Sequence, residues 1–247
     1  MLAELRMALS VDKEGFGYYQ SSNMQGVLME HLENSYAEKL HQQGLKPYSQ
    51  HIEGREEKEW VIKTFTKEAY QEIITPLLCG EFSGFCIEKK DMHVKILEKR
   101  LKTMGKGELL EEFYSGSLNR HILIEFLSPT SFKSDGKYLI IPEIRHLYQS
   151  LMNKYSAASD ELTMCDQETL GQLTENSSIE KYRLRSTCFP LEGVKIPAFM
   201  GELGIYISGT ETMARYARLL FQFGEYAGVG IKTAMGMGAL RIKEAKK

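Results

Sequence analysis

The strongest constraint on the fold is a strand–helix–strand–strand–helix–strand order that occurs twice along the chain. In the first half, alternating apolar residues predict strands, and apolar residues three and four apart predict helices. Gly44 is the expected stop of the first helix. The predicted elements are strand 2–9, helix 23–43, strands 46–52 and 58–65, helix 67–78, and extended segments 82–88 and 92–101. This order is that of the ferredoxin-like unit.

The second half repeats the order. Ser208 and Glu211 have the spacing of a helix capping box, and Pro142 is expected in the first turn of a helix. The predicted elements are strand 121–127, loop 128–136, helix 142–155, strands 182–189 and 199–208, a helix around 213–223 and strand 239–243, with a connection at 103–119 and a polar insertion or surface loop at 157–180. The sequence therefore predicts an α+β protein of two tandem ferredoxin-like domains, 1–110 and 120–247.

Charge is distributed unevenly. The net charge of −2 argues against a strongly basic nucleic-acid-binding protein. From Met213 onward, however, the chain carries seven Lys or Arg residues and only two Glu. A basic end on an acidic chain is a candidate surface for a polyanion, although a solvated lysine tail has the same composition.

Several protein classes are disfavoured. The longest apolar runs, such as 138–142, are far shorter than the roughly 20 residues of a membrane-spanning helix. Glu4 interrupts the apolar start, which disfavours a signal peptide. The four cysteines show no C-x-x-C spacing, so no zinc framework is expected. The predicted protein is cytoplasmic, with no membrane partner.

A glycine-rich segment, GVGIKTAMGMG at 228–238, is the sharpest motif. Its glycines, Gly228, Gly230, Gly236 and Gly238, would let backbone N–H groups approach a phosphate chain. Lys232 and Thr233 in the middle could reach phosphate oxygens. The spacing fits neither a Rossmann fingerprint nor a P-loop. The alternative is a tight helix-to-strand connection in which the glycines serve backbone geometry alone.

Four stretches give the chain a family resemblance. AGVGIKTAMGMGALRI at 227–242, FLSPTSFKSDGKYLIIPE at 126–143, the run 44–49 and IPAFMGELGIYISG at 196–209 resemble the CRISPR-associated endoribonucleases that process precursor guide RNA, members of the RAMP superfamily. The resemblance implies two ferredoxin-like domains, a glycine-rich RNA-binding loop, and repeat RNA of the CRISPR precursor as partner. It leaves open contacts with effector-complex subunits and a homodimer.

The chemistry that the resemblance implies needs no metal or other cofactor, because RNA supplies its own 2′-hydroxyl nucleophile. Cleavage needs proton transfer and a cation near the charged phosphorane, and histidine suits proton transfer near neutral pH. His41 lies in the last turn of the first predicted helix, where the helix dipole favours an imidazolium. By resemblance, the family's histidine and nearby lysine correspond to His41 and Lys46. The alternative for His41 is a surface histidine that caps helix carbonyls.

One position departs from the family. Some members pair the histidine with a tyrosine in the same helix, at a position that corresponds to Met29 here. His31 and Tyr36 are the fallback catalytic candidates. The remaining histidines, His51, His93, His121 and His146, are interpreted as structural or incidental.

Other candidate RNA contacts lie in the second half. Arg183 and Arg185 are two residues apart and so share one face of a strand; the alternative is a solvated face. Ser128 and Thr130 could donate to phosphates or only cap the following turn. The expected function is metal-independent cleavage of CRISPR repeat RNA, and the alternative is an inactive RNA-binding RAMP protein that holds guide RNA.

Overall fold

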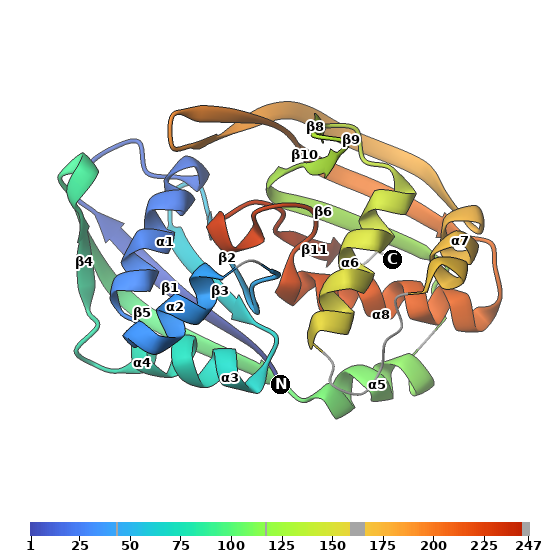
Figure 1. The fold of residues 1–247 in the computed structure, drawn as a ribbon, viewed down its shortest axis with the longest axis horizontal. Helices are drawn as coiled ribbons and strands as arrows, with labels where there is room; N and C mark the ends of the chain where they lie inside the picture. The colour runs from blue at the N-terminus through green and yellow to red at the C-terminus, as the bar shows by residue number, and fades with distance from the viewer. Residues whose placement is uncertain (43, 117, 159–165, 244–247) are drawn as a thin grey trace.

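The computed structural model describes residues 1–42, 44–116, 118–158 and 166–243, which form two sheets with helices packed against them (Figure 1). The first sheet has the order β2-β3-β1-β5-β4. The strands β2, β3, β1 and β5 follow the ferredoxin-like order, and β4 adds an edge strand by pairing with β5. The strands are β1 Leu2–Val11, β2 Tyr48–Glu53, β3 Lys58–Thr64, β4 Gly84–Ile87 and β5 Met92–Met104.

The second sheet has the order β11-β6-β10-β9, again ferredoxin-like. β9 and β10 form a long antiparallel hairpin, and a small separate hairpin, β7–β8, follows β6. The strands are β6 His121–Thr130, β7 Phe132–Ser134, β8 Lys137–Leu139, β9 Ser177–Leu191, β10 Val194–Ile207 and β11 Leu240–Lys243. The predicted tandem ferredoxin-like fold is confirmed.

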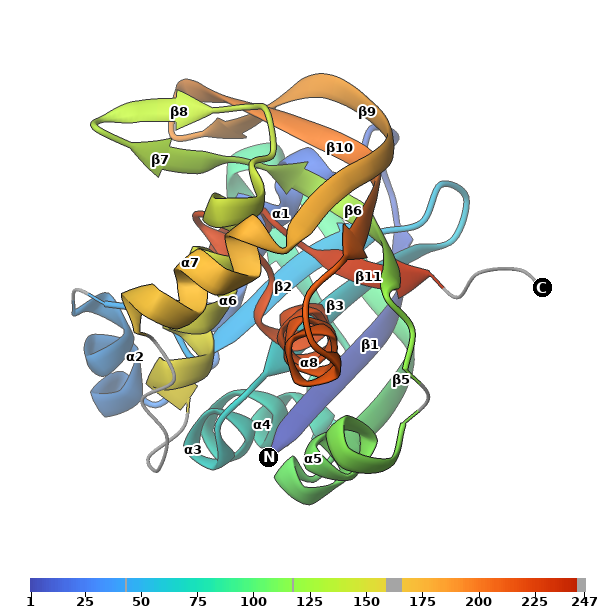
Figure 2. The ribbon, with the colours of Figure 1, turned by 90° about the vertical axis from the view of Figure 1, so that its right-hand side faces the viewer.

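Helices cover one face of each sheet (Figures 1 and 2). The first four helices of the chain, α1 to α4, pack on the first sheet, and α6 and α8 pack on the second sheet. No helix of the described residues is long and apolar enough to cross a membrane. The bounds are α1 Ser21–Glu30, α2 Asn34–His41, α3 Lys67–Ala69, α4 Thr75–Leu78, α5 Lys106–Ser115, α6 Ile144–Ala158, α7 Gln167–Glu175 and α8 Glu211–Ala227, with short turns η1 Tyr18–Gln20, η2 Tyr70–Ile74 (π-helical), η3 Glu88–Lys90 and η4 Thr233–Met235.

The first predicted helix is broken, which corrects the expectation of one helix over 23–43. The apolar residues recur every four positions from Met24 to Leu40. A straight helix of 3.6 residues per turn would place these two residues about 160° apart around its axis. The break between α1 and α2 lets both side chains reach the same core, where both are buried.

Several other expectations were also wrong in detail. The connection 103–119 contains α5, and the loop 128–136 contains the end of β6 and all of β7, the first strand of the β7–β8 hairpin. The surface segment 157–180 contains α7 and the start of β9, with residues 159–165 outside the described part. These short or polar elements gain their order from packing and pairing, which local periodicity does not record.

Helix ends also differ from the predicted signals. The N-cap of α8 is Thr210, whose hydroxyl accepts a hydrogen bond from the Met213 N–H at 3.3 Å. The Ser208 hydroxyl instead donates to the Asn176 carbonyl. Pro142 precedes α6, which begins at Ile144 rather than including the proline in its first turn.

The two halves meet along the C-terminal end of α8. The Ser49 hydroxyl of β2 donates to the Tyr226 carbonyl at 2.6 Å, and the Lys63 ammonium of β3 donates to the Glu225 carbonyl at 2.7 Å. A small third core joins the β9–β10 hairpin to the glycine-rich segment through Phe189 and Met237. The segment between α8 and β11 is therefore held by both halves.

Candidate active site and RNA interface

The glycine-rich loop, residues 228–238, lies between the halves, and close contacts require its glycines. Gly236 has φ +108°, and a Cβ there would lie 2.1 Å from the Ser21 Cβ at the start of α1. Gly230 has φ +76°, and a Cβ there would lie 2.4 Å from the Ser131 carbonyl oxygen. A side chain at either position would push the loop away from its neighbours.

Most backbone N–H groups of the loop bond to protein. Val229 donates to the Gly238 carbonyl at 2.8 Å, Gly238 to the Pro129 carbonyl at 3.0 Å, and Gly230 to the Ser150 hydroxyl at 2.8 Å. The cradle of free N–H groups predicted for a phosphate is therefore largely used by the fold. The loop instead presents the exposed Lys232 side chain, whose residue has φ +54°.

The hydroxyls predicted to donate to phosphates are buried. Ser128 and Thr130 are fully buried; the Ser128 hydroxyl accepts from the Ala239 N–H, and the Thr130 hydroxyl donates to the Ser128 carbonyl. Thr233 is also buried. In this structure the three hydroxyls support the loop from inside, which corrects the expectation of direct access to phosphate.

Lys154 is a residue that the sequence analysis missed. Its buried ammonium donates to the carbonyls of Ala227 and Gly228 at 3.2 and 3.0 Å and to the Thr233 hydroxyl at 3.2 Å. These acceptors join the end of α8 to the middle of the glycine-rich loop. Burial lowers the pKa of Lys154 to about 7. Its helical spacing with Leu147 and Leu151 was a signal that α6 buries a cation.

His41 is the last residue of α2 and lines a groove of about 550 Å³. The groove also contains Gln25 and Met29 of α1, Glu192 at the tip of the β9–β10 hairpin, and Met235 of η4. The fold thus brings the predicted histidine of the first half and the glycine-rich loop of the second half to one groove. This is the central juxtaposition expected from the sequence.

The other catalytic candidates lie differently. The Lys46 ammonium donates to the Gln42 carbonyl, directly after His41, but Lys46 does not line the groove. Tyr36 is buried in the core of the first half, and burial raises the pKa of its hydroxyl. His31 packs edge-on against Phe82, and its Nδ1 lies 2.8 Å from the Val27 carbonyl oxygen. Neither fallback residue lines the groove with His41.

Arg183 and Arg185 share one face of β9, as their spacing predicted, and the structure places that face opposite α6 and α8. In the register of the β9–β10 hairpin, Arg183 lies opposite Glu202 and Arg185 lies opposite Met200. Arg185 also lines a second groove of about 720 Å³, which we call the inter-sheet groove, together with Arg55, Lys58 and Arg241. Its basic side chains come from both halves.

A partly buried charge network lies between the two sheets and was not predicted. Glu4 contacts Lys63 at 2.9 Å and Arg6 at 2.6 Å. Burial alone would raise the pKa of Glu4, but the Lys63 and Arg6 charges outweigh it and lower the pKa to about 2. His51, interpreted as structural or incidental, is buried beside Glu53 at 3.2 Å, and burial lowers its pKa.

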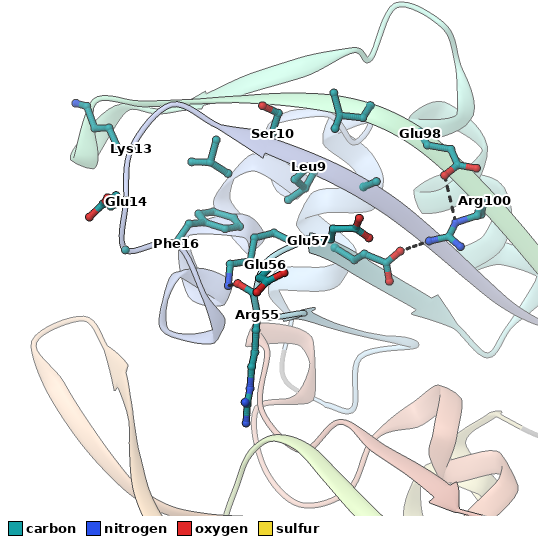
Figure 3. A pocket seen from close by; sticks show the side chains of 16 residues that line it. Leu9, Ser10, Lys13, Glu14, Phe16, Arg55, Glu56, Glu57, Glu98 and Arg100 are labelled. Atoms are coloured by element: carbon teal, nitrogen blue, oxygen red, sulfur yellow. Dashed lines mark hydrogen bonds and ion pairs between the residues drawn. The ribbon is translucent and has the colours of Figure 1, made fainter.

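A third hollow, of about 1000 Å³, lies on the first sheet, outside the groove that His41 lines (Figure 3). Arg55, Glu56 and Glu57 from the β2–β3 turn line it, and Arg100 forms ion pairs there with Glu59 and Glu98. None of the predicted catalytic or RNA-binding residues lines this hollow. We do not assign the active site to it.

Comparison with known proteins decides the family. A family model, CRISPR-associated endoribonuclease Cas6, matches residues 124–240. A CRISPR-associated endoribonuclease Cas6 from Streptococcus thermophilus is 36% identical over 223 residues, which cover 90% of this chain and 90% of that protein. The chain belongs to the Cas6 family. A Cas6 endoribonuclease from Mycobacterium tuberculosis is 33% identical over 223 residues, which cover 90% of this chain and 71% of that protein.

Solved Cas6 structures share the fold. A Cas6 from Thermus thermophilus superimposes with a TM-score of 0.70 at 19% identity, covering 98% of each chain. A Cas6-related protein from Pyrococcus furiosus gives a TM-score of 0.66 at 16% identity over the whole of both chains. A Cas6 solved as a product complex gives a TM-score of 0.80 at 21% identity, covering 98% of this chain and 99% of that chain. At these identities the likeness supports the tandem ferredoxin-like architecture of a Cas6 protein.

Proposed function

We propose that this Cas6 endoribonuclease cleaves the repeat RNA of the CRISPR precursor by 2′-hydroxyl attack on the adjacent phosphate, with His41 in proton transfer. The observation that supports this assignment is that His41 of the first half and Met235 of the glycine-rich loop line one groove. The named relatives are endoribonucleases, which favours an enzyme over an inactive guide-holding protein.

The reaction is an internal transesterification. The 2′-oxygen loses its proton and bonds to phosphorus, the bond from phosphorus to the 5′-oxygen breaks, and that oxygen takes up a proton. The expected products carry a 2′,3′-cyclic phosphate and a 5′-hydroxyl. His41 supplies one of the proton transfers near neutral pH. Lys46, whose ammonium donates to the carbonyl of Gln42 next to His41, offsets the charge of the phosphorane.

Met29 cannot transfer a proton, so His41 acts without a tyrosine at that position. Gln25, four residues before Met29 in α1, lines the same groove and has a neutral side chain that can form hydrogen bonds. Its amide can orient the attacking ribose but cannot act as a base. The Lys232 ammonium is exposed on the loop and is proposed to bind the RNA backbone.

The test is cleavage of repeat RNA in EDTA, with the ends of the products identified. We expect undiminished cleavage in EDTA and a 5′-hydroxyl on the downstream product. His41→Ala should lower the rate by roughly 100-fold or more, as for loss of a general acid–base group. His93→Ala, at an exposed histidine of β5, is the matched control and should cleave like the parent. Strict dependence on added magnesium would contradict the proposed chemistry.

A further inference from the structure

We propose that the outer face of the second sheet, the face opposite α6 and α8, carries a second RNA contact: a stacking platform for unpaired nucleotides built from His121 and Tyr206. This inference rests on the proposed function, because the nucleotides belong to the RNA cleaved beside His41. It assigns a role in RNA binding to His121, whose sequence context indicated only a structural or incidental residue.

The two rings lie on the central strands of the sheet. His121 opens β6 and pairs directly with Tyr206 of β10, and their ring centroids are 4.9 Å apart. Leu203, Ile205 and Ile207 of β10 are buried in the core under the helices. Tyr206 alternates with them and therefore lies on the outer face. The His121 side chain is 61% exposed, so this end of the face is open.

The imidazole is fixed in orientation. The Glu180 carboxylate lies 2.8 Å from Nδ1 of His121. A carboxylate at neutral pH only accepts hydrogen bonds, so Nδ1 carries the proton. The ring is thus held against Tyr206 before any ligand arrives, and less ordering is needed when a base stacks on the pair. Flat, pre-positioned rings on an open sheet face suit the planes of nucleobases.

A line of cations leads from these rings to the inter-sheet groove. Lys181, Arg183 and Arg185 are exposed and alternate along the outer face of β9, the edge strand. The nearby Glu202 carboxylate bonds to Lys243 at 2.6 Å rather than to them. Among the described residues, none of the three forms an ion pair. Such unpaired cations complement the phosphates of an RNA strand.

Gly204 brings Lys181 close to the rings. A Cβ at Gly204 would lie 2.7 Å from Cγ of Lys181, so the lysine stem crosses β10 where a side chain is absent. Met200, which lies opposite Arg185, precedes Tyr206 by six residues on β10, a distance of roughly 20 Å along the strand. Arg185 lines the inter-sheet groove at the far end of this line. Phosphates on the cations and bases on the rings form the usual pair of contacts for a single strand.

The experiment compares two RNAs: the repeat alone, and the repeat with unpaired flanking nucleotides, one of them 2-aminopurine. Binding is measured by titration with Tyr206→Leu, Tyr206→Phe and His121→Ala. Tyr114→Leu, at an exposed tyrosine of α5 outside this face, is the matched control. We expect Tyr206→Leu to bind the flanked RNA roughly 5- to 100-fold more weakly, the range for loss of one stacked base.

The parent and Tyr206→Phe should quench 2-aminopurine fluorescence, because both keep an aromatic face, and Tyr206→Leu should not. The repeat alone should bind all variants equally. Equal weakening of both RNAs by Tyr206→Leu, or no weakening of either, overturns the platform. Cleavage by the parent is measured in the same samples: cleavage without a Tyr206 effect overturns the platform alone, and absence of cleavage overturns the proposed function.

Discussion

Lys154 shows, at the scale of one residue, how a buried charge can organise a functional loop. Its three donors bond to two carbonyls at the end of α8 and to the Thr233 hydroxyl. The carbonyl end of a helix carries partial negative charge, so a cation there is favourable. Burial nevertheless lowers the pKa of the ammonium to about 7. Lys154 therefore fixes the geometry of the loop but lowers the free energy of unfolding while its ammonium is charged.

The lowered pKa of Lys154 predicts that the free energy of unfolding depends on pH. The unfolded chain keeps the ordinary lysine pKa of about 10.4, so between pH 7 and pH 10 it binds more protons than the folded chain. The stability of the parent relative to Lys154→Met should therefore rise by about 2 kcal/mol from pH 7 to pH 9. Denaturant unfolding at the two pH values measures this difference. A difference that is constant with pH would mean that Lys154 titrates normally.

At the scale of one element, the glycine-rich loop depends on close approach more than on flexibility. Gly236→Ala should destabilise the protein by about 1–3 kcal/mol, because it combines an unfavourable positive φ with a clash. The clash is with Ser21 of the other half, so repeat RNA binding should weaken as well. Denaturant unfolding and RNA titration check the two effects.

Gly171→Ala is the matched control for that substitution. Gly171 lies inside α7, and a Cβ there meets no atom within 4 Å. Alanine favours a helix over glycine, so this variant should be more stable by roughly 0.5–1 kcal/mol. If both glycine variants behaved alike, the close packing of the loop would not be the reason for Gly236.

Elements with a strong apolar period could be predicted from the sequence, and elements ordered by contacts elsewhere could not. Strands such as β1 and β6 bury one face and alternate clearly. Residues 128–131 contain two serines and a threonine and were expected to form a loop, yet they are buried because the glycine-rich loop packs over them. That contact joins residues about a hundred positions apart, which no local pattern encodes.

The candidate site followed the same rule. His41 could be found because a helix end and a family resemblance point to one residue. The helical spacing of Lys154 could indicate its burial, but its role could not be predicted, because its three acceptors come from the end of α8 and the loop after it. The rings of His121 and Tyr206 become neighbours only through strand pairing between β6 and β10. The sequence indicates which side chains can transfer a proton or carry a charge, whereas the residues that they contact are set by the fold.

At the scale of the whole molecule, the charge network between the sheets stabilises the arrangement of the two halves. Glu4 bonds to Lys63, which also donates to the Glu225 carbonyl of the second half. The pKa of Glu4 is lowered to about 2, so its contribution is complete above the ordinary carboxyl pKa and is lost as the pH falls toward 2. Acid should therefore weaken the contact between the halves.

Glu4→Gln tests this coupling. The variant should be less stable than the parent by about 2 kcal/mol at pH 7, and the two should converge as the pH approaches 2. Denaturant unfolding across this range follows the difference. Equal stability at pH 7 would show that the network contributes nothing net, as occurs for some buried ion pairs.

In the proposed function, the glycine-rich loop of the second half binds the RNA, and the imidazole of the first half transfers a proton at the cleaved phosphodiester. The most direct measurement is the single-turnover cleavage rate of repeat RNA in EDTA as a function of protein concentration. His41→Ala should lower the saturating rate by roughly 100-fold or more without changing the half-saturating concentration. Lys232→Ala should raise that concentration and leave the saturating rate unchanged. A parental saturating rate in His41→Ala would show that the His41 imidazole does not transfer the proton.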